Sequence, residues 1–249
     1  MPFRADSLNI SISDPVLYGE HGIPIPDVPR SDSVIALVLL FCFVAAVVSV
    51  THLRGVFLGN LKNLFYPQHK SGDAISDTSA ELRYQLLLAF IGCILYAVST
   101  LIVSTHFYPQ GFVFDRITMM GVLTAMFVAY FLCRMLLYTI VNVVFFDGKR
   151  NLRFLHYILF LSSVDAIFLL PMAVLQVYFG LEPKTVLYYV AIVLILNKIH
   201  TFYLSWSIFF RRNGGVLQTF LYFCALEITP LLAFCVAGLM IVKALRVIF

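Results

Sequence analysis

Residues 34–50 read VIALVLLFCFVAAVVSV, a run without a single charged side chain. A second run, from Leu86 to Val98, is also apolar on every side. Strands of a membrane barrel alternate lipid-facing and lumen-facing residues, and these runs show no such alternation. A helix pairs its backbone groups within itself, as hydrocarbon requires. The two runs therefore predict α-helices that cross a lipid bilayer.

The rest of the chain has the same character. Of its 249 residues, 61% are hydrophobic and 12% are charged, whereas soluble domains average about 45 to 50% apolar and about 25% charged residues. Crossing about 30 Å of hydrocarbon takes about 20 helical residues. We place spans at 34–50, 85–107, 117–142, 154–179, 185–209 and 217–242. The expected fold class is all-α, a polytopic transmembrane helical bundle of about six spans.

Two regions follow from this placement. Residues 1–33 form a polar, proline-rich N-terminal tail, and residues 34–249 form the transmembrane domain. The tail lacks the basic start, short apolar stretch and cleavage site of a signal peptide. We therefore expect the first apolar run to remain as a membrane anchor.

The stretch after the first span has two open interpretations. Leu53, Val56, Phe57, Leu61 and Leu64 recur at helical spacing, with polar residues between them. This pattern is typical of an amphipathic helix in the membrane interface. The alternative is that the first span continues as one long helix.

Basic residues between the spans predict the orientation. Nine lie on the side of the loops after the first, third and fifth spans, and six lie on the other side. Because cytoplasmic loops carry an excess of Lys and Arg, both termini are expected outside the cytoplasm. In a bacterium that side is the periplasm.

Four ionisable residues fall deep inside the spans: Arg134, Asp165, Lys198 and Glu227. Each Arg, Lys or Asp at a helix centre costs roughly 2.5 to 3.5 kcal/mol on insertion scales. Such residues therefore pair with one another or mark a pathway. Counting 1.5 Å per residue puts all four in one layer. We expect Glu227 to pair with Lys198 or Arg134, and Asp165 to pair with the other cation.

Further residues are expected to support this charge network. Polar side chains follow Arg134 and Lys198 on the same helix faces, and two prolines sit in the helices that carry the carboxylates. A proline kink releases backbone carbonyls that could line a cavity. The supporting positions are Tyr138, Asn142, Thr201, Pro171 and Pro230. In addition, Gly121, Ala125 and Ala129 form a ridge of small residues, which favours a close contact with another helix.

The sequence shows no pattern typical of a metal site, a cofactor site or a catalytic site. No two histidines share a helix at metal-ligand spacing, and the five cysteines show no CxxC pattern. A glycine-rich phosphate loop, HExxH and GxSxG are all missing from the sequence. We therefore expect no metal, cofactor or catalytic residue. The basic residues serve as topology signals, and no nucleic-acid partner is expected.

The segment LYFCALEITP, from Leu221 to Pro230, resembles the C-terminal signature of an uncharacterised family of multi-span membrane proteins from Bacteroidota. The tail around Gly19, Gly22, Pro24 and Asp32 also resembles that family's entry to its first span, as does the basic amphipathic stretch after that span. The resemblance implies a location in the bacterial inner membrane. It implies no substrate, cofactor or catalytic residue.

Three functional classes remain open. The first is a non-enzymatic assembly or scaffolding component with a buried charge layer, whose partners are the lipid bilayer, other membrane proteins or further copies of the chain. The second is a small-solute or proton-coupled transporter. The third is a membrane enzyme acting on lipid. A dry, fully paired charge layer favours the first class, whereas a water-filled cavity reaching Glu227 favours the second.

Overall fold

The computed structural model describes residues 33–65, 79–107, 116–145, 148–210 and 216–244. The expected polar tail lies outside these ranges, apart from Ser33. Across them the chain is almost entirely helical and contains no strand. Six of the described helical stretches are long and apolar enough to cross a membrane. The predicted all-α transmembrane bundle is confirmed, and the chain is a multi-pass membrane protein.

The helical elements follow one another with short connections. In order they are α1 (Ser33–Phe65), α2 (Ser79–Phe107), α3 (Arg116–Phe145), α4 (Gly148–Phe179), α5 (Pro183–Ser205), η2 (Trp206–Phe210), α6 (Val216–Phe223), η3 (Cys224–Ile228) and α7 (Thr229–Ala244). The elements η2 and η3 are π-helical turns. The last span runs through α6, η3 and α7, from Phe220 to Ile241.

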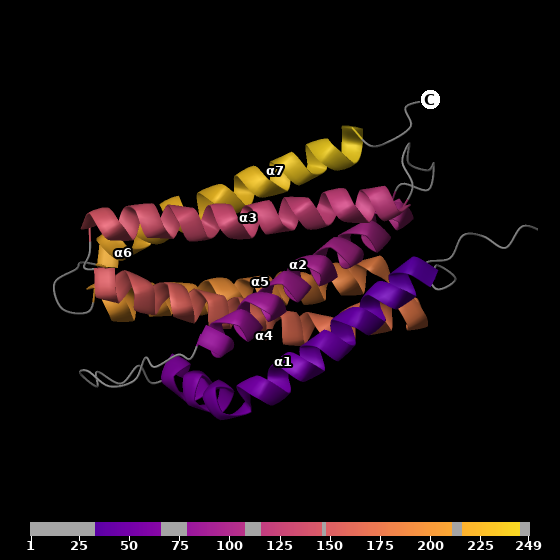
Figure 1. Cartoon of the computed structure of the whole chain (residues 1–249). Coiled ribbons are helices and arrows are strands. Elements are labelled where there is room, and N and C mark those ends of the chain that lie inside the picture. The colour runs from indigo at the N-terminus through magenta and orange to yellow at the C-terminus, as the bar shows by residue number, and fades with distance from the viewer. Residues whose placement is uncertain (1–32, 66–78, 108–115, 146–147, 211–215, 245–249) are drawn as a thin grey trace, which may run out of the picture.

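Helices α2 and α4 form the centre of the bundle. Figure 1 shows α1 crossing them on one flank and α3 running beside α7 at the opposite edge. In their spans, 61% of α2 and 50% of α4 is buried, against 11% for α3 and for the last span. A span that is buried so little inside the protein presents most of its apolar surface to lipid. The outer faces of α3 and α7 are therefore open to lipid or to another helix.

Gly92 explains how closely α2 approaches α4. A Cβ atom at this position would lie 3.3 Å from the Cβ of Ala166 and 3.8 Å from the carbonyl oxygen of Ser162. Small residues at such crossings let two backbones come together in a membrane. This contact holds α4 against the centre of the bundle, in the turn next to Asp165.

The stretch after the first span is helical without a break, since α1 continues to Phe65. In Figure 1 the last turns of α1 leave the line of its first part. The unbroken helix agrees with the interpretation that the first span continues. The change of direction agrees with the interpretation that an amphipathic helix lies in the membrane interface. A location of these last turns at the membrane surface stays a prediction.

The turn from α4 to α5 is tight and well defined. Gly180 adopts a φ of 62°, the left-handed conformation that ends helices and that glycine adopts without strain. Pro183 begins α5, where its missing N–H is not needed. The backbone N–H of Thr185 donates to the carbonyl oxygen of Glu182 at 2.9 Å. The turn fixes α5 beside α4, so that Asn197 and Lys198 lie at the depth of Asp165.

Candidate functional site

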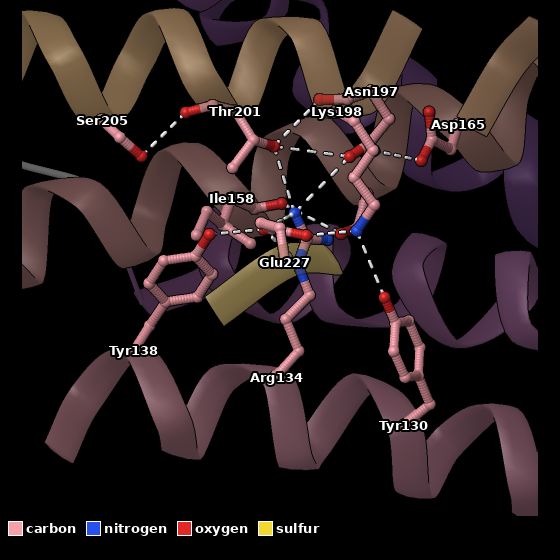
Figure 2. A network of polar contacts seen from close by, with 11 residues as sticks. Tyr130, Arg134, Tyr138, Ile158, Asp165, Asn197, Lys198, Thr201, Ser205 and Glu227 are labelled. Carbon is pink, nitrogen blue, oxygen red and sulfur yellow. Dashed lines mark hydrogen bonds and ion pairs between the residues drawn. The ribbon is translucent and has the colours of Figure 1, made fainter. Parts of the chain in front are cut away.

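One stripe of α3 points into the bundle. Figure 2 shows Tyr130, Arg134 and Tyr138 extending from α3 towards α5 and Glu227. Their spacing of four residues places them on one face of a helix. Arg134 is 5% exposed and Tyr138 is fully buried. An arginine this deep requires compensating acceptors, because an unpaired buried charge is costly.

Glu227 supplies the main acceptor. The Nε and Nη2 atoms of Arg134 lie 2.8 and 2.7 Å from its Oε1 atom. The hydroxyl of Tyr138 donates to the same oxygen at 2.5 Å, and Lys198 Nζ forms an ion pair with Oε2. Glu227 has no exposed surface. Both of its carboxylate oxygens are therefore occupied, and two cations share one anion.

The helix around Glu227 is locally widened. Pro230 has no N–H, so the carbonyl of Leu226 loses its usual partner four residues on. Next to the proline, the backbone N–H of Thr229 donates to the carbonyl of Cys224, five residues earlier, as in a π-helix. The Thr229 hydroxyl donates to the same oxygen at 3.1 Å. This π-helical turn, η3, carries Glu227. Turns of this kind are frequent at functional sites because they redirect a side chain.

Helix α5 completes the surroundings of Arg134. The Nη2 atom of Arg134 donates to the hydroxyl of Thr201 at 3.1 Å and contacts Oδ1 of Asn197 at 3.5 Å. Thr201 in turn donates to the backbone carbonyl of Asn197 at 2.9 Å. Both α5 side chains are buried. We call Glu227, Arg134, Lys198, Tyr138 and Thr201 the Glu227 network.

Asp165 stands apart from the ion pairs. Its Oδ2 atom accepts a hydrogen bond from the side-chain amide of Asn197. Among the residues that the structure describes, no ion pair involves Asp165. The expectation that Asp165 pairs directly with the second cation is therefore wrong. The physical reason is that Lys198 reaches Glu227 and also donates to the Tyr130 hydroxyl at 3.2 Å.

A second polar group lies nearer the end of α3. The hydroxyl of Tyr222 donates to Oδ1 of Asn142 at 2.5 Å, and the Asn142 amide donates to Oδ1 of Asn151 at 3.1 Å. Tyr222 also lies close to Tyr138, with 6.1 Å between the ring centroids. Asn142 thus supports the site through its hydrogen bond with Tyr222.

The two prolines behave differently. Pro230 shapes the turn that carries Glu227, as described above. Pro171 lies inside α4, less than two turns beyond Asp165. Close to it, the carbonyl of Phe168 accepts a hydrogen bond from the Tyr189 hydroxyl of α5 at 2.8 Å. Pro171 is not among the residues that contact Glu227.

The sequence analysis missed three members of the site. Asn197 bridges Asp165 and Arg134, while Asn151 and Tyr222 hold Asn142. One signal could have identified Asn197, because it precedes Thr201 by four residues and shares its face. For Tyr222 no comparable signal exists, since tyrosines gather near the ends of membrane spans whether or not a site lies there.

The ridge of small residues lies outside these contacts. Gly121, Ala125 and Ala129 are exposed on α3. A Cβ atom at Gly121 would meet nothing within 4 Å. The predicted close contact of this ridge with another helix therefore stays a prediction.

Comparison with known proteins identifies the family but no activity. The model of the family described as Domain of unknown function (DUF4271) matches residues 35–237. The chain belongs to this family. Neither the curated proteins nor the solved structures gave a match. A family of unknown function thus covers most of the chain, as expected, while the signature segment and the origin in Bacteroidota stay predictions.

Proposed function

We propose that this protein is a non-enzymatic assembly or scaffolding component of a bacterial inner membrane, in which the Glu227 network locks the last helices together. One observation carries the proposal. Glu227 has no exposed surface, and both of its oxygens are bonded to groups of α3 and α5. A closed, paired charge layer fixes which helices are neighbours.

A conduction pathway would need different surroundings. Charged groups that move protons or ions through a membrane face a water-filled cavity or the bundle interior along a path. Arg134 is held by Glu227, Thr201 and Asn197 together. Each of these bonds would have to break before Arg134 could move. The arrangement therefore supports a structural role for these residues.

An assembly component also needs an outward surface that fits a partner. The exposed ridge of Gly121, Ala125 and Ala129 lets the backbone of another helix come close. Cys133 continues the ridge by one turn and is exposed as well. We propose that a second copy of α3 packs on this ridge.

The proposed orientation follows from the loop charges. Nine basic residues lie on the side of the loops after the first, third and fifth spans, against six on the other side. The positive-inside rule then places both termini in the periplasm. The resemblance to membrane proteins of Bacteroidota supports the inner membrane as the location.

A proton-coupled transporter is the second candidate, and one observation favours it. The side chain of Lys198 keeps 16% of its surface exposed, and Asp165 is only partly buried. Both groups thus keep some exposed surface, whereas Glu227 keeps none. A proton-coupled transporter would use these two side chains to bind and release protons, whereas a scaffold needs only the charges that they carry.

The experiment compares the size and the transport activity of the full chain. The purified protein in a mild detergent should be larger than a monomer, as measured by light scattering. Ala125→Phe should return it to a monomer, because a bulky ring blocks the ridge. Ile195→Phe is the matched control, since Ile195 is 58% exposed on α5. A monomeric wild type that moves protons into proteoliposomes would refute the proposal.

A further inference from the structure

Asp165 differs from every other charged group of the site. It lies midway along the fourth span, between Asn151 and Phe179. Its described partner is the neutral amide of Asn197, whereas both nearby cations contact Glu227. A carboxylate inside a membrane that lacks an ion-pair partner has one other way to lose its charge, which is to bind a proton.

The groups around Asp165 leave this option open. Helix α4 packs against α1, α2, α3, α5 and η2. Arg134 from α3, Lys198 from α5 and Tyr96 from α2 interact electrostatically with Asp165. The described residues of α1 and η2 add no charged group to this set. The Tyr96 hydroxyl is buried and has no hydrogen-bond partner among the described residues.

Polar side chains lead to Asp165 from one side of the membrane. We call this the turn side, where α3 ends at Phe145 and α4 begins at Gly148. On this side hydrogen bonds join Asn151, Asn142 and Tyr222. The ring of Tyr222 lies 6.1 Å from that of Tyr138, whose hydroxyl donates to Glu227 at the centre. In Figure 2 Asp165 lies at the far end of this series, beyond Asn197.

The other half of the bundle is different. Beyond Asp165 the centre is filled by buried apolar side chains of α2 and α4, among them Leu95, Val98, Leu169, Ala173 and Val177. Gln176 also lies there, and its amide donates to the backbone carbonyl of Ser99. Among the described residues, no series of hydrogen-bonded side chains leads through this core to Asp165.

We propose that Asp165 is a proton-binding site that exchanges protons with the turn side of the membrane only. A proton from water binds to one carboxylate oxygen, and its release restores the anion, so that no other reactant is needed. Asn197 contacts both Asp165 and Arg134 and passes the change of charge to the Glu227 network. The proposal does not depend on the assembly role, because a scaffold and a transporter could each carry such a site.

Chemical labelling of the full-length wild-type protein tests the proposal. Dicyclohexylcarbodiimide dissolves in membranes and reacts with protonated carboxyl groups. The carboxyl oxygen bonds to the central carbon, the proton moves to a nitrogen, and the product rearranges to a stable N-acylurea. Peptide mass spectrometry locates the adduct. We expect labelling of Asp165, with a rate that rises about tenfold per unit of falling pH while the group is mostly ionised. Glu227 is the internal control and should stay unlabelled.

The sidedness is measured in sealed vesicles of both orientations. The outer pH is lowered while the lumen stays buffered. Labelling should rise only in vesicles whose turn side faces outward. A rate at Asp165 that does not depend on pH, an absence of labelling there, or a response from the opposite side would overturn the proposal. Because no substitution is needed, none of these outcomes can be attributed to misfolding.

Discussion

The Nη2 atom of Arg134 lies 2.7 Å from Oε1 of Glu227, although the two residues are 93 positions apart in the chain. This ion pair joins the middle of α3 to η3 in the last span. The last span is otherwise only 11% buried within the protein. The pair is therefore a main attachment of the last span to the bundle, together with the ring of Phe234, which lies 4.6 Å from that of Tyr130.

Arg134→Lys tests the shape of the cation. A lysine keeps the charge but lacks the planar fork that reaches Glu227 and Thr201 at the same time. We expect the free energy of unfolding in bicelles to fall by about 2 kcal/mol, the value of one hydrogen bond to a charged group. An unchanged free energy would show that only the charge matters.

Tyr138→Phe removes one hydroxyl and leaves the ring. The hydroxyl donates to Glu227 at 2.5 Å in a fully buried setting. Its loss should cost about 1.5 to 3 kcal/mol in the same unfolding measurement, because the acceptor is charged. Tyr188→Phe is the control, since Tyr188 is 70% exposed. Equal effects of the two changes would contradict the assigned bond.

Gly92→Val tests the close approach of α2 and α4. The added side chain would press on Ala166, whose Cβ lies 3.3 Å from the position of a new Cβ. We expect a loss of about 1 to 3 kcal/mol, the usual cost of overpacking. Gly121→Val should be close to neutral for the fold, because nothing lies within 4 Å of that position. A destabilisation by both changes would argue against the packing described for α2 and α4.

The orientation can be tested with single cysteines in a background that lacks the five native ones. Gly148→Cys and Glu182→Cys place thiols at exposed positions on opposite ends of α4. An impermeant maleimide added to intact cells with a permeabilised outer membrane should label the second and miss the first. The reverse pattern would place both termini in the cytoplasm.

The fold could be predicted from the sequence because apolar runs of sufficient length allow only one kind of structure in lipid. Depth counting also put Arg134, Lys198 and Glu227 into one layer, and in the structure these three side chains meet. Their partners depend on rotation about each helix axis. The π-helical turn at Glu227 changes that rotation in a way that ideal helix geometry does not contain.

The partner of Asp165 could not be predicted for a related reason. All four charged residues share a depth, so counting along the helices could not decide which cation is closer to which anion. The arrangement depends on Lys198 extending to Glu227 and on Asn197 taking its place at Asp165. The course of the chain after Val50 was equally open, because one amphipathic pattern suits both a surface helix and a continued span.

The most direct test of the central claim is the free energy of unfolding of Glu227→Gln in bicelles, measured beside Glu182→Gln. Glu182 is the matched carboxylate, because its contact with Lys184 is 4.0 Å long and both side chains are largely exposed. Breaking a buried ion pair leaves cations unpaired and should cost about 3 to 5 kcal/mol. The exposed pair should contribute less than about 1 kcal/mol. If Glu227→Gln proves as stable as Glu182→Gln, the Glu227 network does not hold the last helices together.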